Sequence, residues 1–452
     1  MLGMRRRLRW LQRLFWVVLR RLQGRMHWWL RRWLQRLRRS VQLKATHDPP
    51  SNDGWRIVSI FKRQLTDAMS STFPEKKRRT IQIAITERCN LNCVYCYEHR
   101  KDMRILPVNP IKEFLLRETE HLDSFDEFEI NFHGGEPMMA FPQIREVAEW
   151  VWNRDWPKPY ICFATTNGTL VHGEIKEWFK ANAKRFVLGL SLDGTKDMHD
   201  RNRSNSYDQI DFSFFRETWP FQAVKATVSP YSIHSFSDGV KHIVELGFPF
   251  SINLAYGMEW PDELLPVYRR ELQRVADFFL SNPSRELPKL LTHIVSKIGA
   301  EESRKPEDRD YGKWCGTGDG MICLGPDEKI YPCQAFMPSS EVKDGDVVRT
   351  ELDFSKDVIF RDPDCAGCLL ESACPSCYGN NYTRTGTLYK RDKTLCKFRK
   401  VEAVATSYLF GMMLQDPEKY VALAKMGPSE RLAVARGVKI IQETLADEVE
   451  GY

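Results

Sequence analysis

The chain has 452 residues, of which 42% are hydrophobic and 28% charged, with a formal net charge of +7. This balance is typical of a globular protein with a sizeable core, and it excludes a wholly disordered or collagen-like chain. The longest apolar run near the start has six residues, which is too short for a membrane span or a signal-peptide core. We therefore expect a cytoplasmic protein with reduced cysteines, of which eleven of the twelve fall into two groups suited to metal binding rather than to disulfides.

Residues 1–40 differ from the remainder, because they carry 13 Arg and no acidic residue, whereas the remainder has a net charge of −6. Apolar residues recur every three or four positions, which predicts an amphipathic helical arm. An arginine-rich helix of this kind suits an anionic membrane surface. The alternatives are a helix docked on the body, or non-native sequence translated from a misassigned start codon. No recognition motif accompanies the arm, so we expect no nucleic-acid partner.

After a linker over residues 41–78, strand and helix patterns alternate over residues 79–300. Six short segments rich in β-branched or aromatic residues predict strands: Ile81–Thr86, Glu127–Phe132, Tyr160–Thr165, Phe186–Ser191, Ala223–Val228 and Phe250–Ala255. Helical patterns lie between them, at Ile111–Leu122, Ile144–Trp152, Glu174–Asn182 and Gly239–Leu246. Six βα units predict an α/β fold with a parallel sheet, open or curled into a partial TIM-like barrel. Catalytic groups of such a fold gather at the C-terminal ends of its strands.

The C-terminal part is predicted to hold two further regions. Residues 301–400 contain eight of the twelve cysteines and are expected to form a small cysteine-rich domain. Residues 401–452 read as a helical tail. Cys162 stands alone in a predicted apolar strand, and we expect it to be a buried core thiol.

Directly after the first predicted strand, Cys89, Cys93 and Cys96 form a C-x3-C-x2-C motif. Three thiolates on one loop can hold three irons of a [4Fe–4S] cluster and leave the fourth iron open for a substrate or cofactor. A structural zinc site usually has four ligands, and no fourth ligand lies at zinc-finger spacing, so zinc is the less favoured alternative.

This loop, with Tyr95 before its third cysteine, closely resembles that of the radical S-adenosylmethionine (radical SAM) enzymes. The resemblance implies that the open iron binds SAM and that an electron from the cluster cleaves SAM to methionine and a 5′-deoxyadenosyl radical. That radical abstracts a hydrogen from the substrate, while the protein supplies position. The resemblance also assigns Cys89, Cys93 and Cys96 as cluster ligands and puts Tyr95 near the adenine.

Three more strand ends match motifs of this family. The run His133-Gly134-Gly135-Glu136-Pro137 would alone be read as a turn, but here it matches the motif that contacts the methionine amino group of SAM. We interpret His133 as structural. Thr166-Asn167-Gly168 ends the third strand. Ser191 ends the fourth and Arg203 follows it, at positions that contact the SAM ribose and carboxylate in related enzymes. The alternative is a turn serine and a surface arginine.

Eight further cysteines suit two fully ligated [4Fe–4S] clusters, and their pattern resembles the SPASM domain, which ends a subgroup of radical SAM enzymes acting mostly on peptides and proteins. The resemblance implies one auxiliary cluster on Cys315, Cys323, Cys333 and Cys377, and another on Cys365, Cys368, Cys374 and Cys396. Two departures affect the loop geometry rather than the number of ligands. Only two residues separate Cys374 from Cys377, where the family usually has three, and Glu328 replaces a glycine. A zinc ribbon over residues 365–377 is the alternative.

The residue after Cys333 bears on the substrate. Relatives that oxidise a Cys or Ser of sulfatases to formylglycine carry an Asp there as a proton acceptor, whereas this chain has Gln334, which cannot act as a carboxylate base. We therefore expect maturation of a ribosomally synthesised peptide, by cross-linking or epimerisation, with flavodoxin or ferredoxin as the reducing partner. The alternatives are anaerobic sulfatase maturation and a non-catalytic iron–sulfur electron carrier. A pure carrier would close every cluster with protein ligands.

Overall fold

A computed structural model describes residues 76–98, 101, 103–305, 314–337, 354 and 361–450 of the chain. The predicted arm over residues 1–40 and all but the last three residues of the predicted linker lie outside these ranges. Residues 76–452 belong to a single compact unit. Within the described ranges, no helix is both long enough and apolar enough to cross a membrane.

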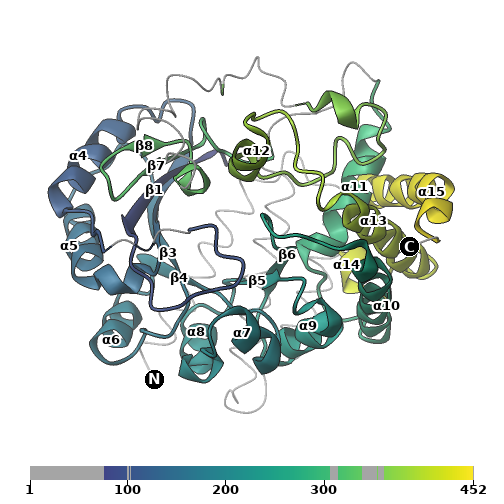
Figure 1. Cartoon of the computed structure of the whole chain (residues 1–452), viewed down its shortest axis with the longest axis horizontal. Helices are drawn as coiled ribbons and strands as arrows, with labels where there is room; N and C mark the ends of the chain where they lie inside the picture. The colour runs from purple at the N-terminus through teal and green to yellow at the C-terminus, as the bar shows by residue number, and fades with distance from the viewer. Residues whose placement is uncertain are drawn as a thin grey trace, which may run out of the picture. The chain divides into compact units, whose positions relative to one another are not determined.

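The six predicted strands are present and follow one another in chain order (Figure 1). Four of them, β1 (Arg78–Thr86), β2 (Glu127–Gly134), β3 (Tyr160–Thr166) and β4 (Phe186–Leu190), pair in parallel. A second parallel pair, β5 (Val224–Val228) and β6 (Phe250–Leu254), continues the series, because Ser191 at the end of β4 forms a parallel bridge with Lys225 of β5. The expected α/β fold with a partial barrel is therefore confirmed.

The cysteine-rich segment extends the barrel sheet at its other edge. Strand β7 (Met321–Leu324) pairs in parallel with β1, and β8 (Ile330–Tyr331) pairs antiparallel with β7. The order of the resulting sheet is β4-β3-β2-β1-β7-β8. This pairing brings Cys323 of β7 opposite Gln82 of β1, although 241 residues separate them in the chain. The barrel and the first part of the cysteine-rich segment therefore share one sheet.

Helices connect the barrel strands and cover their outer side (Figure 1). They are α4 (Val108–Thr119), α5 (Phe141–Trp152), α6 (Gly173–Ala181), α7 (Lys196–Asn202), α8 (Phe212–Thr218) and α9 (Phe236–Glu245). Short 3₁₀ helices lie at η1 (Pro137–Ala140), η2 (Tyr207–Gln209), η3 (Ile233–Ser235), η4 (Asp262–Leu264), η6 (Gln334–Phe336) and η8 (Pro363–Cys365). The helices after the barrel are α10 (Leu265–Ser281), α11 (Lys289–Glu301), α12 (Tyr378–Thr385), α13 (Cys396–Met413), α14 (Val421–Ala424) and α15 (Pro428–Glu450). The last three confirm the predicted helical tail.

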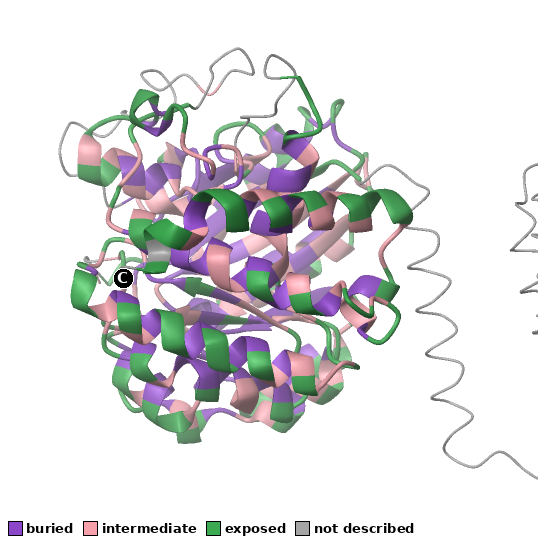
Figure 2. Ribbon diagram, turned by 90° about the vertical axis from the view of Figure 1, so that its right-hand side faces the viewer, coloured by how far each residue is buried: buried purple, intermediate pink, exposed green. Residues whose placement is uncertain are grey.

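The two faces of the sheet differ in burial. On β2 the alternate residues Phe128, Ile130 and Phe132 are fully buried, and they belong to the core between the strands and the outer helices. The alternating residues Glu129, Asn131 and His133 are only partly buried and face the inner side. Figure 2 shows the same division, with buried residues on the strands and exposed ones on the outer surfaces of the helices. The polar inner face is thus available to a ligand.

Cys162 lies on the buried face of β3 and is fully buried. Burial raises the pKa of its thiol to about 12. The sequence-based interpretation as a core thiol is therefore confirmed.

The helices after the barrel pack closely on one another, and a pair of glycines permits the closest crossing. A Cβ atom on Gly299 of α11 would lie 1.7 Å from the carbonyl oxygen of Ala433 on α15. A Cβ on Gly437 of α15 would lie 2.0 Å from the carbonyl oxygen of Val295 on α11. Only glycine leaves room for these backbones, so the two positions determine how near α15 packs to α11.

Candidate functional site

The three-cysteine loop follows the C-terminal end of β1, where the sequence places it. Cys89, Cys93 and Cys96 are all partly buried. Burial raises the pKa of each thiol, to about 11 for Cys93, and the charges of Cys96 and Cys89 raise the pKa of Cys93 further. The three thiols therefore lie within electrostatic reach of one another. A metal that binds them must displace their protons.

Residues between the cysteines attach the loop to neighbouring strand ends. The backbone N–H of Val94 donates to the carbonyl oxygen of Asn202, the last residue of α7, at 3.0 Å. The Asn90 side chain donates to Thr169 Oγ1 at 2.8 Å and accepts from Asn167 Nδ2 at 2.9 Å. These bonds tie the loop to the segments that follow β3 and β4. The predicted site residues on different strands are thereby brought to one end of the sheet.

The glycine pair at the end of β2 packs directly against the start of the cysteine loop. Gly134 has a φ of +143°, and a Cβ there would lie 2.2 Å from the carbonyl oxygen of Thr86. A Cβ on Gly135 would lie 2.3 Å from the carbonyl oxygen of Arg88. The N–H groups of Gly135 and Glu136 donate to these two oxygens, at 2.8 and 2.7 Å. Both positions therefore require glycine for β2 to approach the loop so closely.

The Glu136 carboxylate is buried at the same strand end, with 1% of the residue exposed. It accepts hydrogen bonds from Thr166 Oγ1 at 2.7 Å, from the N–H of Asn167 at 2.8 Å and from the N–H of Met138 at 3.1 Å. Burial raises the pKa of Glu136, and the hydrogen bonds oppose that shift. A carboxylate has about four lone-pair sites, so three donors leave capacity for a further donor such as an ammonium group.

A second buried network joins the cysteine loop to the segment after β4. The Tyr95 hydroxyl donates to the Asp193 carboxylate, and Arg203 Nε donates to Asp193 Oδ2 at 3.0 Å. The Arg203 guanidinium carbon lies 5.4 Å from the centroid of the Tyr95 ring. Burial raises the pKa of Tyr95. The charge of Asp193 raises the pKa of Arg203, although burial opposes that shift. The hydroxyl is therefore neutral and the guanidinium charged.

Arg203 is 8% exposed, so the alternative reading of it as a surface arginine is wrong. Ser191 is buried between β3 and β5, where its N–H donates to the carbonyl oxygen of Thr166 at 3.0 Å.

Two further residues of this network, Asp193 and Asn202, were not among the site residues assigned from the sequence. Asp193 accepts bonds from three different segments, including the N–H of Thr227 on β5 at 2.9 Å. Its position in the turn after β4 was the only sequence signal.

The inner face of the barrel carries a lysine that the sequence interpretation also missed. Lys225 Nζ of β5 donates to Thr165 Oγ1 of β3 at 3.0 Å, and burial lowers the pKa of Lys225. Burial, with a smaller effect of the Lys225 charge, lowers the pKa of His133 to about 4. Among the described residues, His133 Nδ1 has no hydrogen-bond partner. A charged residue within the short apolar strand Val224–Val228 was the signal that could have identified this position.

The predicted first auxiliary group gathers beside β7 and β8. Burial raises the pKa of Cys333 to about 12, and the charges of Cys377 and Cys315 add to this effect. The charge of Cys333 in turn raises the pKa of Cys323 beyond the effect of burial. The structure thus brings these four thiols near enough for their charges to interact, with Cys333 interacting with the other three.

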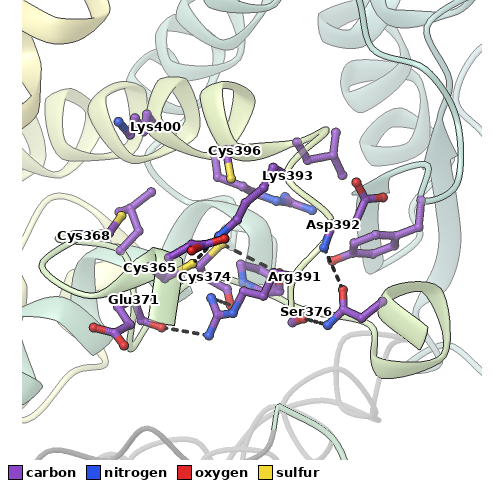
Figure 3. Close-up of a pocket in the computed structure, with 17 residues that line it drawn as sticks. Cys365, Cys368, Glu371, Cys374, Ser376, Arg391, Asp392, Lys393, Cys396 and Lys400 are labelled. Atoms are coloured by element: carbon purple, nitrogen blue, oxygen red, sulfur yellow. Dashed lines mark hydrogen bonds between the residues drawn. The ribbon is translucent and has the colours of Figure 1, made fainter. Parts of the chain in front are cut away.

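The four cysteines of the predicted second group line one cavity of ≈ 250 Å³ (Figure 3). Cys365 ends η8, Cys368 and Cys374 lie in the following loop, and Cys396 begins α13. Cys377, three positions after Cys374, instead precedes the first residue of α12, does not line this cavity, and its charge raises the pKa of Cys333 in the first group. The short spacing between Cys374 and Cys377 therefore does not prevent the two groups from separating.

Two tyrosines interact electrostatically with more than one sulfur group, and neither was identified from the sequence. The pKa of Tyr97 is raised, chiefly by desolvation and less by the charges of Cys96, Cys333 and Cys323, although 39% of the residue is exposed. Tyr97 therefore lies within electrostatic reach of both the three-cysteine loop and the first auxiliary group. Burial likewise raises the pKa of Tyr256, with contributions from Cys377 and Cys374, which belong to different auxiliary groups.

The donor sets suit iron–sulfur clusters, which are held by cysteine thiolates. In a [4Fe–4S] cluster each thiolate binds a different iron, so the sulfur atoms stand further apart than around zinc. Three thiols on one loop and two groups of four match one open and two closed clusters.

Comparison with known proteins agrees with this geometry. Residues 83–211 match the sequence profile of the Radical SAM superfamily. The antilisterial bacteriocin subtilosin biosynthesis protein AlbA of Bacillus subtilis (strain 168) is 23% identical over 280 residues, which cover 61% of this chain and 58% of that protein. A cysteine-type anaerobic sulfatase-maturating enzyme of Clostridium novyi (strain NT) is 33% identical over 138 residues, 28% of this chain and 36% of that protein. The matches thus span less than two thirds of these relatives.

Among solved structures, native anSMEcpe with bound AdoMet has a TM-score of 0.56 and 17% identity. The match covers 74% of this chain and 99% of that one, and it concerns the fold. Strands β2 to β4, the three-cysteine loop and the strand-end motifs lie within the matched range, and β1 overlaps its start, whereas β5 and β6 lie beyond it. Residues 83–211 of this chain therefore form a domain of the radical SAM superfamily.

Proposed function

We propose that this chain is a radical SAM enzyme that modifies a peptide, in the maturation of a ribosomally synthesised peptide. The observation that carries the proposal is the attachment of the Cys89–Cys96 loop to the ends of β2 and β3 and to α7, beside the Glu136 carboxylate and the Tyr95–Asp193–Arg203 network. When bound, the cluster supplies the electron that cleaves SAM to methionine and a 5′-deoxyadenosyl radical.

The protein groups would bind and orient SAM. Glu136, with a remaining lone-pair site, would accept from the ammonium group of its methionine part. Arg203 carries a buried positive charge suited to a carboxylate, and Tyr95 offers a ring beside the loop for the adenine. Ser191, at the junction of β4 and β5, would contact the ribose. Gly134 and Gly135 let the backbone of β2 approach the loop.

We further propose two auxiliary [4Fe–4S] clusters, one on Cys315, Cys323, Cys333 and Cys377 and one on Cys365, Cys368, Cys374 and Cys396. The electrostatic proximity of the thiols within each group supports this assignment. The division into a barrel over residues 79–300, an auxiliary-cluster domain over 301–400 and a tail over 401–452 belongs to the same proposal. Flavodoxin or ferredoxin would supply the electron.

The position of Gln334 supports a peptide substrate. Its backbone N–H donates to Gln82 Oε1 of β1 at 3.2 Å, so it lies where the cysteine-rich segment meets the barrel. Its own side-chain oxygen is shielded from solvent and has no partner among the described residues. An amide oxygen of this kind accepts hydrogen bonds from peptide N–H groups. The relative named for subtilosin biosynthesis agrees with a peptide substrate.

The test is SAM cleavage by the anaerobically reconstituted, reduced protein. We expect 5′-deoxyadenosine to form, and Cys96→Ala to abolish it, because two thiolates cannot hold the site-differentiated cluster. Cys162→Ala is a matched control, because Cys162 lies in the core of β3 rather than in a sulfur group. A wild-type protein that holds all its iron but forms no 5′-deoxyadenosine would identify an electron carrier instead.

Anaerobic sulfatase maturation is the second candidate, and the relative from Clostridium novyi favours it. It requires a proton acceptor, and Gln334 cannot supply one at neutral pH. We therefore expect a sulfatase-motif peptide to remain unconverted, and Gln334→Asp alone not to create the activity. Mass spectrometry of the peptide after reaction tests this expectation. Efficient loss of two hydrogens with formation of an aldehyde would establish sulfatase maturation.

We also propose that the arginine-rich arm over residues 1–40 contacts an anionic membrane surface. Its deletion should leave SAM cleavage intact and reduce salt-sensitive binding to anionic vesicles. Unchanged vesicle binding by the truncated chain would contradict this proposal.

A further inference from the structure

The cavity of the second cysteine group is also lined by positively charged side chains (Figure 3). Arg391, Lys393 and Arg399 line it together with the four cysteines. Three acidic residues, Asp364, Glu371 and Asp392, line the same cavity, and Glu371 pairs with Arg361. Against the four basic residues Arg391, Lys393, Arg399 and Lys400, the lining carries a formal excess of one positive charge.

Lys393 contacts the sulfur group directly. Its Nζ lies 3.0 Å from Cys365 Sγ and 2.8 Å from Asp362 Oδ2. Asp362 is 1% exposed and also accepts the N–H groups of Arg391 and Asp364, at 2.8 and 2.9 Å. The ion pair with this buried carboxylate therefore holds the Lys393 ammonium group against the sulfur.

Arg399 provides a second, independent observation at this cavity. It is 2% exposed, and its Nη1 donates to both carboxylate oxygens of Glu402, at 2.9 and 2.7 Å. Tyr268 holds Glu402 in turn, through a hydrogen bond of 2.8 Å. The Nη2 atom of Arg399 is shielded from solvent and makes no well-formed hydrogen bond among the described residues, although the Tyr256 hydroxyl lies near the guanidinium. A buried donor without a partner is costly, and a sulfur acceptor in the cavity would satisfy it.

We propose that Lys393 and Arg399 are positioning residues that hold the second auxiliary cluster at a higher reduction potential than neutral side chains would. This inference rests on the proposed function, because it requires a [4Fe–4S] cluster on the four cysteines of the cavity. Reduction adds one electron and no proton to a group that four thiolates already make anionic. Fixed positive charge nearby stabilises the more negative, reduced form, and hydrogen bonds to sulfur act in the same direction.

The test is an anaerobic redox titration of the full-length reconstituted protein, followed by electron paramagnetic resonance, with the titrant supplying the electrons. We expect Lys393→Met to move the midpoint potential of one cluster to a lower value and to leave the other clusters unchanged. Lys393→Arg should restore the potential, because it retains the charge. Lys397→Met is the matched control: Lys397 follows Cys396 on α13 but pairs with Asp262 and does not line the cavity. Unchanged potentials in Lys393→Met with full iron content would overturn the inference.

Two further variants keep the test decisive. If Lys393→Met fails to retain iron, Lys393→Gln removes the charge but keeps an N–H donor, and it should shift the potential in the same direction by a smaller amount. The pair Arg399→Gln and Glu402→Gln removes both buried charges together, so neither is left without its partner, and it should also lower the potential of the same cluster. In either case, an unchanged midpoint potential in a variant that retains its full iron content would contradict the inference.

The proposed function fails in a different way. If the double variant Cys365→Ala and Cys368→Ala retains the iron content and the spectrum of the wild type, the cavity holds no cluster. That result would refute the assignment of the second auxiliary group before any question of its potential arises.

Discussion

At the scale of single residues, the site depends on charges that are buried together. Asp193 accepts hydrogen bonds from Tyr95, Arg203 and the backbone of Thr227, and only 1% of it is exposed. Arg203 is almost as deeply buried. Taking one partner from such a pair leaves an uncompensated charge away from water, and this costs more than the pair itself contributes. The network therefore links the stability of the barrel to the geometry of the proposed SAM site.

We accordingly predict that Asp193→Asn lowers the free energy of unfolding by about 3 kcal/mol, because Arg203 loses its buried counter-charge. It should also weaken SAM binding, since Tyr95 and Arg203 lose their common acceptor. Thermal unfolding and equilibrium binding of SAM would measure the two effects. Asp208→Asn is the control, because Asp208 is 73% exposed and its ion pair with Lys196 is screened by solvent. Equal behaviour of the two variants would contradict the role given to Asp193.

Whether a functional residue could be predicted from the sequence depended on the kind of signal that marks it. The cysteines, Glu136 and Arg203 could be named because their spacing resembles a known family, and the structure places them at strand ends or in sulfur groups. Asp193, Lys225 and Tyr97 could not, because their importance arises from neighbours that strand pairing brings near. Lys225 illustrates this point: its hydrogen-bond partner Thr165 belongs to β3, whereas its bridge partner Ser191 follows β4.

At the scale of secondary-structure elements, the sequence pattern predicted where the strands lie, but it did not predict which of them pair. Each barrel strand carries β-branched or aromatic residues within a short run, so all six could be located from the sequence. Strands β7 and β8 have only four and two residues, and β7 pairs with β1 from a distant part of the chain. No local pattern encodes such a contact. The close packing of α11 on α15 was equally invisible, because single glycines within helices carry no directional signal.

That helix crossing leads to a prediction. Gly299→Ala should lower the thermal unfolding midpoint, because its Cβ would lie 1.7 Å from a backbone oxygen of α15 and the helices must move apart, at a cost of about 1–3 kcal/mol. Gly411→Ala on α13 is the matched control. Its Cβ would meet nothing nearer than 3.4 Å, and alanine favours the helix over glycine by up to about 1 kcal/mol. The two substitutions should therefore shift the midpoint in opposite directions, and a shift of the same sign would contradict the packing argument.

At the scale of the whole molecule, the sulfur groups form a series rather than separate sites. Tyr97 lies within electrostatic reach of Cys96 on the barrel loop and of Cys323 and Cys333 in the first auxiliary group. Tyr256 lies between that group and the second, beside Cys377 and Cys374. Because β7 joins the barrel sheet directly, the first auxiliary group is held at the edge of the barrel. A cluster held by Cys315, Cys323, Cys333 and Cys377 would therefore lie beside the barrel and supply an electron acceptor there.

This arrangement predicts distinct consequences for losing each group. The reconstituted chain should bind three [4Fe–4S] clusters, or about 12 iron atoms, and Cys96→Ala or Cys377→Ala should each bind about 8. Cys96→Ala should lose SAM cleavage altogether. Cys377→Ala should retain cleavage of SAM better than it retains formation of the peptide product, because the loop that binds SAM is intact while the acceptor for the remaining electron is absent. Iron analysis, 5′-deoxyadenosine formation and mass spectrometry of the peptide would be measured on the same preparations. If Cys377→Ala loses SAM cleavage while Cys96→Ala retains it, the roles of the two groups are reversed. If the wild type holds about four irons, with zinc on the remaining cysteines, the chain has no auxiliary iron–sulfur clusters.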